Sequence, residues 1–193
     1  MTKDYRVQML AGDVAKEYVF VGGPLDDFPD GVGTMFEAIG YVVASWSRVE
    51  QHLDTIIMQI NEPGHAANLY DDNHPISFRP KLAFIKKWFN QSPALASYAD
   101  EMRQIRIDLK RLGGFRDDLV HSTIQSFDAE TKTAKFESIR FLKATKEFKV
   151  EDFTADITFM AKLAAAINRT NFRLGAISKE LFTPDAAQRS GKP

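Results

Sequence analysis

Hydrophobic residues recur at seven-residue intervals in three long segments of the chain, a spacing that places them on one face of an α-helix. The three series are Ile39, Trp46, Leu53 and Ile60 in residues 34–61; Leu95, Met102 and Leu109 in residues 92–112; and Phe153, Met160, Ile167, Leu174 and Leu181 in residues 151–181. A shorter segment, residues 78–90, also carries apolar residues on one helical face. The pattern therefore predicts a mainly α protein in which four main helices pack as a bundle.

The segment between the third and fourth predicted helices has a different pattern. Residues 123–127 and 134–141 are rich in β-branched and aromatic residues, and a polar turn at residues 128–132 separates them. These features predict a small β-hairpin inserted before the last helix.

The two ends of the chain lack a helical period. Residues 1–33 contain several Gly and Pro residues, so they predict an irregular N-terminal arm with one short strand at residues 19–21. We expect this arm to cover the bundle or to contact another chain, and we expect residues 182–193 to form a disordered tail. Residues 34–181 are then a single domain.

Composition and charge narrow the functional classes. The chain has 193 residues, a net charge of −1 and no cysteine, so disulfides and thiolate metal sites are excluded. Because the net charge of the chain is close to zero, RNA binding would need a local basic patch on its surface. The charged N-terminus and the lack of a run of about 20 apolar residues predict a cytoplasmic protein with no membrane partner. No His-x3-His or His-Glu-x-x-His spacing occurs, so we expect no metal and no cofactor.

Arg116 interrupts the apolar series of the third helix, because the next position after residues 95, 102 and 109 is 116. A buried guanidinium needs an acidic partner or a bound anion. His121 follows five residues later, which turns it about 140° away around the helix axis. Two chains related by a two-fold axis bring these side chains together more easily than one chain does, so the motif predicts a homodimer.

The segment Arg116-Asp117-Asp118-Leu119-Val120-His121 resembles the signature of the HEPN superfamily, the higher eukaryotes and prokaryotes nucleotide-binding domain. That signature is an arginine, four to six residues and a histidine, often with a polar residue after the arginine. A long first helix with Trp46 and Glu50 is also similar to small bacterial and phage members. The resemblance covers residues 34–181 in architecture and only these six residues in motif, and the inserted hairpin departs from it.

The resemblance implies a metal-independent endoribonuclease, such as a toxin or defence component, with a possible partner or inhibitor protein. An imidazole at His121 suits general-base catalysis near neutral pH. Arg116 would hold the negative charge of the reacting phosphate, and Asp117 would orient Arg116 or His121. Glu50 would support Arg116 from the first helix. The expected product is a 2′,3′-cyclic phosphate.

RNA binding would need further cations. Arg103, Arg106 and Lys110 fall on one side of the third helix with Arg111 beside them, and they form a candidate phosphate-binding stripe. Asp100, Glu101 and Asp108 are interspersed, so the alternative is an ordinary solvated face of mixed charge.

The motif itself also has a non-catalytic interpretation. In this alternative Arg116 pairs with Asp117 or Glu50, and His121 ends the helix as a C-terminal cap. The chain would then be a helical protein-interaction module or a structural dimer without a ligand.

Overall fold

A computed structural model of the protein describes residues 4–11, 14–21, 31–61, 75–142 and 144–181. The helices are α1 (Val32–Asn61), α2 (Phe78–Gln91), the short 3-10 helix η2 (Pro93–Tyr98), α3 (Ala99–Val120) and α4 (Ile157–Leu181). The strands are β1 (Asp4–Ala11), β2 (Val14–Val21), β3 (Ser122–Asp128), β4 (Thr133–Leu142) and β5 (Glu147–Asp156). The described chain is thus mainly helical with a small three-stranded antiparallel sheet, and none of its described helices is long and apolar enough to cross a membrane.

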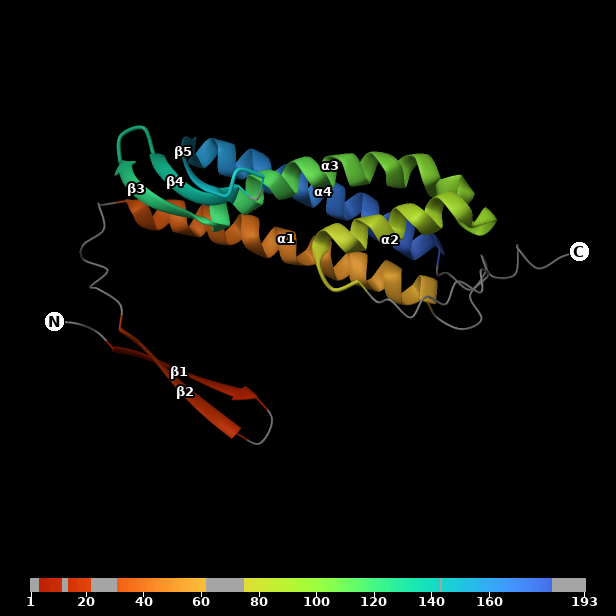
Figure 1. Cartoon of the computed structure of the whole chain (residues 1–193), viewed down its shortest axis with the longest axis horizontal. Coiled ribbons are helices and arrows are strands. Elements are labelled where there is room, and N and C mark those ends of the chain that lie inside the picture. The colour runs from red at the N-terminus through yellow and green to blue at the C-terminus, as the bar shows by residue number, and fades with distance from the viewer. Residues whose placement is uncertain (1–3, 12–13, 22–30, 62–74, 143, 182–193) are drawn as a thin grey trace, which may run out of the picture.

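The three long helices α1, α3 and α4 lie side by side, and α2 packs against α1 and α3 (Figure 1). The predicted apolar series of each helix faces the common core. Its fully buried members include Leu53 of α1, Leu109 of α3, and Ile167 and Leu174 of α4. Because burial of each such side chain contributes about 1.5–3 kcal/mol, these stripes account for the assembly of the helices.

The third helix begins later than predicted, but its buried residues Met102 and Leu109 belong to the predicted apolar series. Residues 93–98 form η2, and the α-helix begins at Ala99. It then runs without interruption through Gly113 and Gly114 to Val120, so the glycines do not break it.

The prediction that the last helix begins at residue 151 is wrong. Residues 147–156 instead form β5, which pairs antiparallel with β4 and turns the expected hairpin into a sheet of order β3-β4-β5. Phe153 stacks on Phe136 with 4.9 Å between ring centroids, so Phe153 belongs to the sheet and not to the helical stripe. The helix starts at Ile157 because the Asp156 carboxylate accepts a hydrogen bond from the Phe159 N–H at 2.5 Å, as an N-cap does.

The N-terminal arm is also more regular than predicted. Strands β1 and β2 pair antiparallel over their whole length, from Asp4 opposite Val21 to Ala11 opposite Val14. Figure 1 shows this hairpin standing apart from the helices. The predicted tail, residues 182–193, lies outside the described residues.

Candidate active site

The predicted motif lies where α3 ends and passes into β3, at the sheet end of the bundle (Figure 1). Arg116 is half-buried on the inner side of α3, as its place in the apolar series predicts. Its Nη1 donates to Asp117 Oδ1 at 3.0 Å. Its Nε is buried and has no hydrogen-bond partner among the described residues. The guanidinium therefore retains unused donor capacity in a partly desolvated position.

Asp118 is held by a different element. Arg140 of β4 makes an ion pair with the Asp118 carboxylate, and its Nε also lies 3.6 Å from Glu151 of β5. The Ser122 hydroxyl donates to the Asp118 carbonyl oxygen. These contacts fix the end of α3 to the sheet, and they leave Asp118 engaged away from Arg116.

His121 is the C-cap residue of α3, and its backbone N–H donates to the Asp117 carbonyl oxygen at 3.0 Å. Its side chain is exposed, and within the described part of the chain no hydrogen bond or ion pair reaches the imidazole. No contact joins it to Arg116. One chain thus contains both features of the non-catalytic alternative, because Arg116 pairs with Asp117 and His121 ends the helix.

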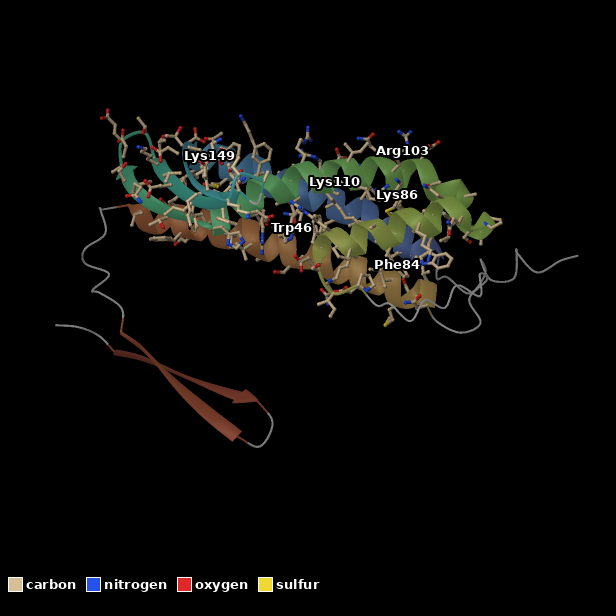
Figure 2. All side chains as sticks on the ribbon, in the orientation of Figure 1. Trp46, Phe84, Lys86, Arg103, Lys110 and Lys149 are labelled. Atoms are coloured by element: carbon tan, nitrogen blue, oxygen red, sulfur yellow. The ribbon has the colours of Figure 1, made fainter. Side chains whose placement is uncertain are left out.

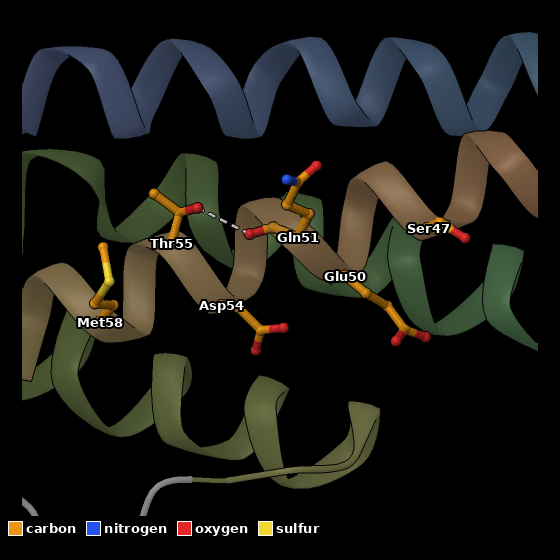
Figure 3. A pocket seen from close by; sticks show the side chains of 6 residues that line it. All are labelled: Ser47, Glu50, Gln51, Asp54, Thr55 and Met58. Atoms are coloured by element: carbon orange, nitrogen blue, oxygen red, sulfur yellow. Dashed lines mark hydrogen bonds between the residues drawn. The ribbon is translucent and has the colours of Figure 1, made fainter. Parts of the chain in front are cut away.

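Glu50 has a partner within its own helix. Its Oε1 accepts a hydrogen bond from Trp46 Nε1 at 2.9 Å, and the described residues show no contact between Glu50 and Arg116. Glu50 and Asp54 line an open cavity of about 510 Å³ along α1 (Figure 3). Asp54 pairs with the buried Lys81 of α2 at 2.7 Å. Both carboxylates are therefore already bonded to groups of this chain.

The four predicted RNA-binding cations have different surroundings. Arg103 is exposed and pairs with Asp100 at 3.3 Å, while Arg111 lies 3.9 Å from Asp108. Lys110 is exposed and has no carboxylate within 4.0 Å among the described residues. Arg106 is half-buried, and its Nε donates to the carbonyl oxygen of Leu82 in α2 at 3.1 Å. Burial lowers the pKa of the Arg106 guanidinium, which has no carboxylate partner in the described structure.

Two of the five acidic residues of α3 are paired from another helix. Arg173 of α4 donates to Glu101 Oε1 at 2.6 Å and to Asp108 Oδ2 at 2.8 Å. The hydrogen bond from Arg173 holds the pKa of the Glu101 carboxyl below its ordinary value. Because Glu101 and Asp108 pair with Arg173, the acidic residues interspersed along α3 do not provide a partner for each of its cations.

Helix α2 adds cations that the sequence analysis did not include. It contains Arg79, Lys81, Lys86 and Lys87 and no acidic residue, and this imbalance was the available signal. Figure 2 labels Lys86 on α2 and Arg103 and Lys110 on α3, and these two helices pack against each other. Arg106 of α3 bonds to the carbonyl oxygen of Leu82, which lies one turn before Lys86, so this part of α2 lies against α3.

No protein-family model, curated protein or solved structure matches this chain. The described residues also contain no group of three or more His, Asp or Glu side chains arranged to hold a metal ion.

Proposed function

We propose that this chain is a metal-independent endoribonuclease of HEPN type, which acts in the cytosol as a homodimer and serves as a toxin or defence component with an inhibitor protein. The observation that carries the proposal is the state of Arg116. It lies at an inward position of α3, and among the described residues its buried Nε has no partner and its one ion-pair partner is the adjacent Asp117.

Neither Glu50, the predicted support on α1, nor Asp118 makes an ion pair with Arg116 in the described structure. Glu50 accepts from Trp46, and Asp118 is held by Arg140. A structural arginine in a bundle core normally has an acid from another helix to satisfy it. Arg116 has none in the described structure, so a phosphate group is the kind of ligand that would complete its hydrogen bonds.

The proposed reaction needs one base and one anion-binding group. His121 takes the proton from the ribose 2′-hydroxyl, and the 2′-oxygen attacks the adjacent phosphorus. The bond from phosphorus to the 5′-oxygen breaks, and that oxygen takes a proton from water. The hydroxide that remains removes the proton from His121, which returns to its starting state. Arg116 stabilises the added negative charge on the phosphorus centre. The products are a 2′,3′-cyclic phosphate and a 5′-hydroxyl.

The position of His121 supports a site shared by two copies. Within α3, Arg116 and His121 point about 140° apart, so one helix does not aim both at the same phosphate. A two-fold dimer that pairs Arg116 of one copy with His121 of the other supplies both groups.

The test of the activity is cleavage of mixed cellular RNA in EDTA by wild type and by His121→Ala. The proposal expects cleavage by the wild type, products that end in a 2′,3′-cyclic phosphate, and loss of cleavage in the variant. No cleavage by a folded, dimeric wild-type protein would contradict it.

A second candidate function, a protein-interaction module, is favoured by one observation on the sheet. Four large apolar residues are exposed in two cross-strand pairs, Ile139 with Val150 and Phe141 with Phe148. The Phe141 and Phe148 ring centroids are 5.2 Å apart. A contiguous exposed apolar patch of this kind is typical of a surface that contacts another protein. This function becomes the better account if the wild type binds no RNA.

A further inference from the structure

The solvent-facing side of α3 carries one continuous row of residues that ends at the candidate base. The row consists of Arg103, Ile107, Lys110, Gly114, Asp117 and His121, all of which are exposed. At about 100° per residue these positions fall within about 80° of one another around the helix axis. Arg103 and His121 are about 27 Å apart along it. We call this set the α3 row.

We propose that the α3 row, together with Lys86 of α2, binds the phosphate backbone of single-stranded RNA and leads it to His121. The proposal rests on the proposed function, because cleavage by an internal 2′-hydroxyl needs a flexible strand next to the base. It goes further by naming where the strand lies and which groups hold it.

The charges of the α3 row favour an anion. Lys110 and Lys86 have no carboxylate within 4.0 Å in the part of the chain that the structure describes. The one acidic residue in the row is Asp117, and its carboxylate forms an ion pair with Arg116 at 3.0 Å. Exposed lysines without acidic partners are the side chains that exchange counterions for phosphates.

Gly114 provides a second, independent observation. A Cβ atom at this position would meet no described atom within 4 Å, so packing inside the chain does not require glycine there. Its neighbour Gly113 is different, because a Cβ there would lie 3.0 Å from the Trp46 ring. Glycine weakens a helix interior relative to alanine, so Gly114 lowers the stability of α3 without a packing contact among the described residues that requires it. A gap between Lys110 and His121 lets a phosphate backbone approach the helix closely.

The row contacts the backbone and not the bases. The exposed apolar side chain of the α3 row is Ile107. The row contains no aromatic residue on which a base would stack. Binding is therefore expected to depend strongly on salt and weakly on sequence.

Binding can be measured apart from cleavage with a labelled 2′-O-methyl RNA of about 16 nucleotides, which has no attacking hydroxyl. We expect Lys110→Gln to weaken binding roughly threefold and to reduce the slope of log affinity against log salt by about 0.7. Gly114→Gln places a long side chain in the gap and should weaken binding by at least a similar factor. The matched controls are Arg48→Gln and Gly40→Gln, two exposed α1 positions, where binding should not change.

Several results would overturn the proposal. One is that Lys110→Gln and Gly114→Gln both bind RNA with wild-type affinity. Another is that the wild type binds no RNA. A third is that poly-L-glutamate competes for binding as strongly as RNA of equal charge. The cleavage assay is separate. A wild type that binds through the α3 row without cutting would contradict the proposed function alone, and one that cuts normally with Lys110→Gln and Gly114→Gln would contradict the row alone.

Discussion

Trp46 of α1 packs directly against the backbone of α3 at Gly113, where an added Cβ would lie 3.0 Å from Trp46 Cη2 and 3.2 Å from Phe78 Cε1. Trp46 is buried and its Nε1 is bonded to Glu50, so the ring cannot move aside freely. The contact explains why α3 needs glycine at this position. It also separates Gly113 from Gly114, which the sequence alone does not distinguish.

We therefore expect Gly113→Ala and Gly114→Ala to have opposite effects on stability. Gly113→Ala should destabilise the protein by about 1 kcal/mol, because overpacking outweighs the gain in helix propensity. Gly114→Ala should stabilise it by about 0.5–1 kcal/mol, since its Cβ meets open space. Urea unfolding measures both. Equal stabilisation by the two substitutions would mean that Trp46 does not press on α3 as described.

The Trp46–Glu50 hydrogen bond gives a second pair of expectations. Glu50→Gln keeps an oxygen acceptor for Trp46 Nε1 and should change the free energy of unfolding by less than about 0.5 kcal/mol. Glu50→Leu leaves a buried donor unsatisfied and should cost about 1–3 kcal/mol. If the leucine variant were as stable as the glutamine variant in urea unfolding, this hydrogen bond would not hold Trp46 in place.

The sequence predicted the helical core because helical periodicity is local. Leu53, Leu109 and Ile167 are buried as their spacing indicates. It misplaced the start of the last helix because Glu151 and Asp152 resemble a helix N-terminus, whereas the actual cap is Asp156. That cap is recognisable only once β5 is paired with β4.

The candidate site was predicted less completely, since its surroundings depend on packing between helices. The spacing from Arg116 to His121 indicates that the two side chains lie about 140° apart around α3, and it leaves open whether they meet within one chain or between two. The partner of Glu50 and the neighbouring cation Lys86 depend on how α1 and α2 lie against α3, which no periodicity shows.

The sheet has two faces with different sensitivity to substitution. Phe136 is fully buried and stacked on Phe153, so Phe136→Ala should cost about 3–5 kcal/mol. Phe148 on the opposite face is 74% exposed, and Phe148→Ala should cost less than about 0.5 kcal/mol. Thermal unfolding of the two variants at the same protein concentration checks this. A large loss in Phe148→Ala would show that the exposed patch is covered in the native protein.

The Glu101–Arg173 pair should make a pH-dependent contribution to the free energy of unfolding. The hydrogen bond from Arg173 lowers the pKa of Glu101 in the folded state, against the opposing effect of burial. The pair therefore stabilises the protein at pH values above the unfolded-state pKa, and this contribution is lost as pH falls through the lower folded-state pKa. Because both side chains are partly exposed, we expect less than about 1 kcal/mol.

Glu101→Gln should thus lower Tm at pH 7 and leave it nearly unchanged in acid below the folded-state pKa. Asp100→Asn is the matched control, because Asp100 is almost fully exposed in its pair with Arg103 and its loss should change little. An equal loss of Tm for Glu101→Gln at both pH values would contradict the pair's role.

The shared site is tested most directly by mixing two inactive variants. Arg116→Ala and His121→Ala chains, co-expressed with different tags, form about half mixed dimers. If Arg116 of one copy works with His121 of the other, each mixed dimer has one intact site, and the mixture should recover about a quarter of wild-type RNA cleavage. A mixture as inactive as its parents, beside an active wild type, would contradict a site built from two copies.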